Sequence, residues 1–74
     1  MWLVTINCST DAWKQCSAAF LLLVDKYEGT CESSQKTADD QRLMAYKIDD
    51  VSDAEAFTEE CQNLAGFTAQ MASL

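Results

Sequence analysis

The sequence predicts an α+β fold with the element order βαββαβ, in which two helices cover one face of a four-stranded antiparallel sheet. Apolar residues alternate with period two in short segments near both ends and in the middle of the chain, and recur at helical spacing in the two longer segments between these. The chain has two glycines and no proline, and each glycine follows one of the helical segments. With 74 residues, the chain is expected to form one domain over residues 1–74.

The first two elements are predicted to be a strand over residues 2–8 and a helix. One face of the strand carries Trp2, Val4, Ile6 and Cys8. Ser9 or Thr10 is expected to cap the helix, because either hydroxyl can accept a hydrogen bond from an unpaired amide of the first turn. The helix places apolar side chains three or four positions apart at Trp13, Cys16, Phe20, Leu23, Val24 and Tyr27. Gly29 is expected to end it.

The next elements are an exposed edge strand over residues 30–36, a turn over 37–40 and a strand over 42–48. The inward face of the second of these strands carries Met44, Tyr46 and Ile48. A second helix is expected from about Asp53, with Gly66 at its C-terminal cap. Its inward face consists of Ala54, Phe57, Cys61 and Leu64.

The last stretch, residues 67–74, allows two interpretations. Its alanines, glutamine and methionine favour a helix, which would give βαββα with a longer C-terminal helix. The glycine before it and the alternation of Phe67, Ala69 and Met71 with polar or small residues favour a fourth strand. We predict the strand. Right-handed crossovers then give the ferredoxin-like arrangement, with both helices on one face of the sheet.

The charge disfavours some classes of partner. The net charge is −7, with twelve acidic residues, five basic residues and no histidine. The basic residues are scattered, so no basic stripe is present to neutralise phosphates or anionic lipid. We therefore expect neither nucleic-acid nor membrane binding. The amino terminus has no basic segment or cleavage site before its first apolar residues, and the longest apolar run is too short to cross a bilayer, so a cytoplasmic protein is expected.

The four cysteines, Cys8, Cys16, Cys31 and Cys61, are expected to be free thiols that are buried or half-buried. No exporting context favours a disulfide scaffold. No C-x-x-C pair is present, and without histidine a zinc site would need all four thiolates. Redox and metal roles are the alternatives.

Residues 47–57, KIDDVSDAEAF, contain a cluster of carboxylates formed by Asp49, Asp50, Asp53 and Glu55. Clustered carboxylates suit magnesium or calcium. The favoured interpretation is structural, because Ser52 and Glu55 match a capping box and Asp53 and Glu55 would suit the first turn of a helix. Val51 and Ala56 would form a weak hydrophobic staple beside it. No metal site is therefore predicted.

Four stretches give the chain its overall pattern: MWLVTI, DAWKQCSAAFLLLVDKYEGT, RLMAYKIDDVSDAEAF and LAGFTAQMASL. This pattern resembles the small dimeric α+β-barrel superfamily, which includes antibiotic-biosynthesis-monooxygenase-like domains and many uncharacterised bacterial proteins. The resemblance implies a homodimer in which two sheets pack face to face. The covered face would carry Leu3, Thr5, Leu43 and Ala45. Haem-degrading members use an axial histidine, which this chain lacks, and no cofactor is expected.

The resemblance also suggests residues that could orient a small molecule. Asn7, Trp13 and Tyr46 are the ligand-binding candidates, and no catalytic residue is assigned. The structural alternatives are that Asn7 ends a strand and that Trp13 and Tyr46 are core or interface aromatics.

Three functions follow as hypotheses. The first is a non-enzymatic homodimeric module that binds a partner protein or a small ligand, for which an apolar molecule is expected. The second is a small cofactor-independent monooxygenase-like enzyme. The third is an acidic interaction domain for a basic protein partner, whose surface would consist of Asp39, Asp40, Asp49, Asp50, Glu59 and Glu60.

Overall fold

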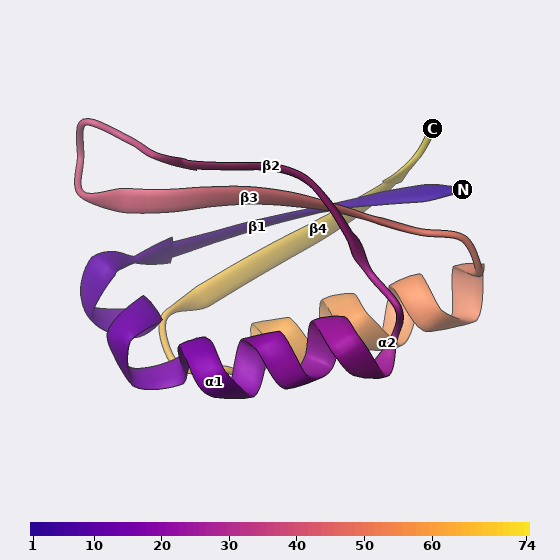
Figure 1. The fold of residues 1–74 in the computed structure, drawn as a ribbon, viewed down its shortest axis with the longest axis horizontal. Coiled ribbons are helices and arrows are strands. Elements are labelled where there is room, and N and C mark those ends of the chain that lie inside the picture. The colour runs from indigo at the N-terminus through magenta and orange to yellow at the C-terminus, as the bar shows by residue number, and fades with distance from the viewer.

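The computed structural model describes residues 1–74 and contains six elements (Figure 1). In chain order they are β1 (Trp2–Ser9), α1 (Thr10–Lys26), β2 (Thr30–Lys36), β3 (Gln41–Ile48), α2 (Val51–Gln62) and β4 (Phe67–Ser73). The strands form one antiparallel sheet in the order β2-β3-β1-β4. Both helices lie on the same face of this sheet, as Figure 1 shows. The ferredoxin-like prediction is confirmed, and the alternative of a longer C-terminal helix is wrong because residues 67–73 pair with β1.

The core lies between the helices and the sheet. Alternate residues of the two central strands are buried in it: Val4, Ile6, Cys8, Met44, Tyr46 and Ile48. Phe20 of α1 lies at its centre and is fully buried. Its ring centroid lies 5.5 Å from that of Tyr46, 6.0 Å from that of Phe57 and 5.7 Å from that of Phe67. Because these rings come from three other elements, Phe20 ties α1 to α2 and to both halves of the sheet.

The caps of α1 come from residues on either side of it. Ser9 is the N-cap, and its Oγ accepts a hydrogen bond of 3.1 Å from the amide of Ala12. At the other end the prediction for Gly29 is wrong: Glu28, not Gly29, takes the left-handed conformation, with φ of 53°. The amide of Gly29 donates to the carbonyl of Val24 at 2.9 Å, and the amide of Glu28 donates to that of Asp25 at 3.3 Å. These two bonds form the Schellman motif, in which Gly29 is one position beyond the left-handed residue.

The second helix begins two residues earlier than predicted. Its N-cap is Asp50, whose carboxylate accepts a hydrogen bond of 3.1 Å from the amide of Asp53. The predicted capping box of Ser52 and Glu55 is therefore wrong, because Ser52 is already inside the helix. Aspartate caps a helix as well as serine does. The sequence therefore contains two candidate caps, Asp50 and Ser52, and each is followed by an acidic residue three positions later.

The predicted C-cap of α2 is also displaced. The helix ends at Gln62 with Asn63 as its C-cap. Gly66 lies three residues further on with φ of +81°, in the turn that leads into β4. Glycine is needed there because this backbone conformation is costly for other residues.

Strand β2 is exposed along all 7 of its residues, as predicted for an edge. Its pairing with β3 shifts between Cys31 and Ser33, where a bulge interrupts the ladder. Bulges and charged side chains on edge strands oppose pairing with other chains. Glu32 supplies such a charge and lies 3.3 Å from Lys47 Nζ.

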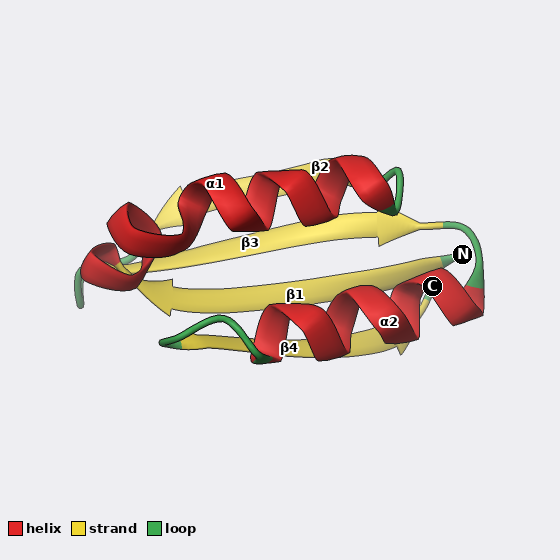
Figure 2. Cartoon of the chain, turned by 90° about the horizontal axis from the view of Figure 1, so that it is seen from below, coloured by secondary structure: helices red, strands yellow, loops and turns green.

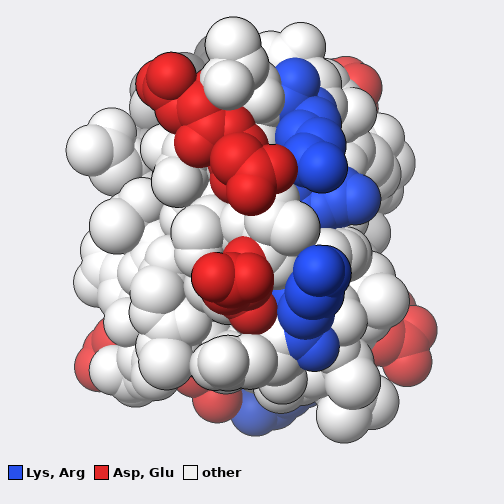
Figure 3. All heavy atoms as spheres, turned by 90° about the vertical axis from the view of Figure 1, so that its left-hand side faces the viewer, with Lys and Arg blue, Asp and Glu red and all other residues white.

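Asp40, in the turn between β2 and β3, fixes this end of the sheet to the start of α1. The hydroxyl of Thr10 donates to Asp40 Oδ1 at 2.9 Å, and Lys36 Nζ lies 3.4 Å from the same oxygen. The hydrogen bond from Thr10, with the contribution of Lys36, lowers the pKa of Asp40. Figure 3 shows this end of the molecule, where acidic and basic side chains lie side by side.

Candidate functional site

The helices leave one face of the sheet uncovered (Figure 1). On β1, β3 and β4 this face alternates with the residues that enter the core. It carries Leu3, Thr5, Asn7, Leu43, Ala45, Lys47, Thr68, Gln70 and Ala72. Within the single chain, the side chains of Leu3, Leu43 and Ala45 are already half-buried. The face is therefore a mixture of small polar side chains and a few aliphatic ones, with Lys47 as its basic residue on these three strands.

A hollow of about 190 Å³ lies in this face near the carboxyl end of β1. Its lining consists of Thr5, Asn7, Leu43, Thr68, Ala69 and Gln70. The register explains the grouping, because Asn7 pairs with Leu43 on one side and with Thr68 on the other. The Thr68 hydroxyl donates to the Asn7 carbonyl at 3.3 Å. The lining offers hydroxyl and amide groups but no ionisable side chain, so its chemistry suits an uncharged molecule that forms hydrogen bonds.

The three ligand-binding candidates from the sequence do not converge on one place. Asn7 lines the hollow in the open face and is exposed. Tyr46 lies on the other side of the sheet, 7% exposed, with its ring edge-on to Phe20 and Phe57. Burial raises the pKa of the Tyr46 hydroxyl, as does the nearby Cys31 thiol. Tyr46 therefore occupies a core position, which was the structural alternative.

Trp13 lies near the start of α1 and is half-buried. Its ring contacts Phe20 edge-on at 5.8 Å between centroids, and the guanidinium carbon of Arg42 lies 4.5 Å from its ring centroid. A cation over an indole face is an attractive arrangement. Trp13 thus packs between the core and Arg42, away from the hollow that contains Asn7.

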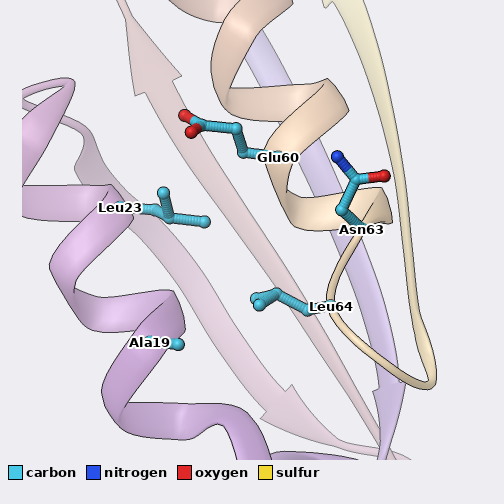
Figure 4. A pocket seen from close by; sticks show the side chains of 5 residues that line it. All are labelled: Ala19, Leu23, Glu60, Asn63 and Leu64. Carbon is cyan, nitrogen blue, oxygen red and sulfur yellow. The ribbon is translucent and has the colours of Figure 1, made fainter.

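A second hollow of about 230 Å³ lies between the two helices, on the opposite side of the molecule from the open face (Figure 4). Ala19 and Leu23 of α1 form one wall, and Glu60, Asn63 and Leu64 form the other. The sequence analysis did not identify this hollow. The signal that could have found it is Ala19, an apolar residue of α1 that lines the hollow but lies outside the predicted inward stripe.

Glu60 gives the hollow between the helices its charge. The Tyr27 hydroxyl donates a hydrogen bond to the Glu60 carboxylate, and Lys26 Nζ lies 3.5 Å from its Oε1. The hydrogen bond from Tyr27, and then the charge of Lys26, lower the pKa of Glu60. The carboxylate is therefore ionised at neutral pH while it lies beside aliphatic side chains.

The acidic residues expected to form one interaction surface fall in three places. Asp39 and Asp40 lie in the turn before β3, and Asp49 and Asp50 follow β3 at its other end. The 8 residues of β3 separate these two pairs. The third pair, on α2, is Glu59 and Glu60. The structure places no group of three or more acidic or cysteine side chains where they could jointly hold a metal ion.

The cysteines are all free thiols. Cys8 and Cys61 are buried and Cys16 is half-buried, but Cys31 is exposed. The expectation that all four would be at least half-buried is wrong for Cys31, because it lies on the edge strand β2, which has no neighbour on its outer side. Burial raises the pKa of the Cys61 thiol to about 12 and also raises that of Cys8.

Neither a protein-family model nor a curated protein matches the sequence. Among solved structures, the chain is similar to the C-terminal domain of the MgtC protein from Mycobacterium tuberculosis, a solution structure. The TM-score is 0.67 at 13% sequence identity, over 96% of this chain and 83% of that one. A likeness at this identity shows the fold alone, so the resemblance to α+β-barrel proteins holds at the level of the ferredoxin-like fold. No helix of the chain combines the length and the apolar character that a membrane span requires.

Proposed function

We propose that two copies of this chain pair through the open faces of their sheets and bind a small uncharged ligand between them. The observation that carries the proposal is the hollow beside Asn7 in a sheet face that no helix covers. The pairing would produce the homodimer that the α+β-barrel resemblance implies. The chain would then be a binding module rather than an enzyme.

The size of the open face supports a pair. Strands of 7 or 8 residues, with ~3.3 Å per residue and ~4.8 Å between strands, give a face of about 25 by 19 Å. Two such faces would bury on the order of 1,000 Å² in total, which is about the smallest area expected of a specific interface and is below the ~1,200–2,000 Å² of standard ones. Face-to-face sheets pack about 10 Å apart, and the small side chains Thr5, Ala45 and Ala72 would allow that approach.

The small core supports the same proposal. Only 14 of the 74 residues are buried. Domains of this length are marginally stable by themselves and commonly gain stability from disulfides, a metal or oligomerisation. All four cysteines are free. Burial of Leu3 and Leu43 against a second copy would add apolar contact to this small core.

The lining of the hollow indicates the class of ligand. Two hydroxyls, from Thr5 and Thr68, and two amides, from Asn7 and Gln70, supply both donors and acceptors beside the apolar Leu43. A ligand with amide or alcohol groups matches this lining better than the apolar molecule expected from the sequence. The oxygenase-like alternative has less support, because the lining contains no aromatic side chain and no group that could transfer a proton.

The oligomeric state tests the pairing. Light scattering should give about twice the monomer mass of 8.2 kDa for the natural chain. Leu43→Lys should give a folded monomer, because a buried lysine in the interface would be unpaired. Leu22→Lys is the matched control: Leu22 lies on α1, away from the open face, and this variant should remain a dimer. A natural chain of 8.2 kDa, or dissociation by the Leu22 variant alone, would refute the pairing.

The ligand class is tested separately by NMR with small fragments. Uncharged amides and alcohols should shift the side-chain amide signals of Asn7 and Gln70, while carboxylates and amines of the same size should leave them unchanged. Equal shifts from charged and uncharged fragments would contradict the proposed class.

A further inference from the structure

Apolar side chains line the space between the two helices and continue onto the outer surface of α1. Ala19, Leu23 and Leu64 form the apolar walls of the hollow there (Figure 4). Leu22 is not part of this lining, but it lies three residues after Ala19, so the two share one side of α1. At 71% exposure, Leu22 is the most exposed large apolar side chain of the protein. Leu22 contributes little to the core, and its contact with water is unfavourable.

The other side of this space is acidic. Helix α2 carries Asp53, Glu55, Glu59 and Glu60 and no lysine or arginine. All four side chains are exposed or half-buried, and Glu60 also lines the hollow. Asp53 lies seven residues before Glu60, so these two carboxylates share the side of α2 next to α1, whereas Glu55 and Glu59 lie on other sides of the helix. The apolar strip on α1 therefore runs beside Asp53 and Glu60.

We propose that this space, the interhelical groove, receives a basic amphipathic helix of a partner protein. One apolar side chain of the partner enters the hollow between Ala19, Leu23 and Leu64, and a second covers Leu22. Lysine or arginine side chains of the partner lie along the carboxylates of α2. The proposal is independent of the sheet-face pair, because the groove lies on the opposite side of the molecule.

The shape of the groove favours a helix as the occupant. The two helices lie side by side over the sheet (Figure 2), so a third helix can lie between them with residues at i, i+3, i+4 and i+7 as its contacts. The hollow of about 230 Å³ is below the usual range for drug-sized ligands, roughly 300–1,000 Å³, and suits a single side chain.

The charges favour a basic occupant over a second copy of this chain. Two copies meeting at this surface would bring the carboxylates of both α2 helices together, at a cost in repulsion that the net charge of −7 increases. Lys26 is no obstacle to an incoming cation. Its pair with Glu60 spans 3.5 Å between side chains that are 59% and 37% exposed, and such surface pairs contribute little to stability.

The proposal is tested with synthetic peptides and the full chain. The probe is a fluorescein-labelled helical peptide with leucine at i, i+3, i+4 and i+7 and lysine at the flanking positions. One comparison peptide replaces each lysine with glutamate. A second has the same composition in a scrambled order that removes the apolar face. Binding is followed by fluorescence anisotropy at moderate salt.

Two leucines of α1 supply matched variants. Leu22→Gln should weaken binding of the basic peptide about tenfold, since a buried leucine contact contributes on this scale. Leu21→Gln should change it by less than about twofold. Leu21 is also exposed, at 51%, but it is turned by about 100° from Leu22 around α1, away from the side that Leu22 shares with Ala19. Both residues face water, so neither change should unfold the protein, and circular dichroism verifies this.

The peptides separate the proposal from its rivals. Binding of the basic amphipathic peptide alone supports the proposal. Equal binding of the scrambled peptide would show that the surface attracts cations without selecting a helix, which would overturn the proposal. Equal losses of peptide affinity in Leu22→Gln and Leu21→Gln would also overturn it. Self-association that Leu22→Gln abolishes would show that a second copy occupies the groove, which also overturns it.

Discussion

Gly66 and Ala12 approach so closely that a Cβ atom on residue 66 would lie 2.7 Å from the Ala12 Cβ. This contact joins the turn before β4 to the first turn of α1, two segments that are far apart in the sequence. Gly66 also has φ of +81°, which side chains disfavour. Two independent reasons therefore require glycine at this position.

The first prediction is that Gly66→Ala destabilises the fold. The backbone conformation should cost about 1–2 kcal/mol, and the overpacking against Ala12 should add roughly 1–3 kcal/mol. Gly29→Ala is the matched control, because a Cβ there would meet Tyr46 and Val24 at 3.5 and 3.6 Å, which are ordinary contacts. Urea unfolding gives both free energies. Equal effects of the two substitutions would contradict the contact between Gly66 and Ala12.

The second prediction concerns the start of α2. Asp50→Ala should reduce the free energy of unfolding by about 0.5–2 kcal/mol, because the amide of Asp53 loses its acceptor. Asp50→Asn should retain most of the stability, since asparagine caps equally well. Ser52→Ala should change it by less than about 0.5 kcal/mol, as expected for a surface position. Thermal unfolding compares the stability of the three variants. A larger loss of stability for Ser52→Ala than for Asp50→Ala would support Ser52 as the cap instead of Asp50.

The third prediction concerns acid sensitivity. Because Tyr27 and Lys26 hold the pKa of Glu60 below its ordinary value of 4.5, the folded state binds this proton less readily than the unfolded state. Their contribution to stability is therefore present above pH 4.5 and is lost as pH falls through the lower pKa of the folded state. In Tyr27→Phe the pKa of Glu60 should rise, and the stability difference between this variant and the natural chain should shrink on acidification.

NMR titration of the Glu60 carboxyl carbon measures that pKa directly in both proteins. Glu59, next to it in α2, provides an internal reference within the same spectra. An unchanged pKa of Glu60 in Tyr27→Phe would show that the Tyr27 hydroxyl does not hold the carboxylate in solution.

The fourth prediction is the order of thiol reactivity. Since the thiolate is the reactive form, the raised pKa of Cys61, about 12, should protect it from iodoacetamide at neutral pH. Cys8 is also buried with a raised pKa and should be protected too. Cys31, exposed on β2, should be alkylated first. Mass spectrometry of time points identifies the sites, and unfolding in urea should expose all four. Rapid labelling of Cys61 in the folded protein would contradict the packing of α2.

Much of the fold could be predicted because local periodicity and core burial agree. The alternation of Val4, Ile6 and Cys8 predicted β1, and the same residues are buried. The final strand was harder, because Ala69, Gln70 and Met71 also favour a helix. Pairing with β1, a tertiary contact, decides in favour of the strand.

The helix ends and the sites were less predictable. Asp50 and Ser52 are both good caps, and only the geometry of the chain leaving β3 selects between them. The hollow beside Asn7 depends on the register of three strands, which the sequence does not specify residue by residue. Tyr46 is an exception. The alternation places it on the inward face of its strand and places Asn7 between the inward residues Ile6 and Cys8, so their separation follows from the pattern.

The location of the interface tests the central proposal most directly. A sample that mixes isotope-labelled and unlabelled chains allows NMR to detect contacts between copies only. The proposal predicts such contacts among the methyl groups of Leu3, Leu43 and Ala45. Contacts at Leu21 and Leu22 instead, or no contacts together with a mass of 8.2 kDa, would contradict pairing through the open face.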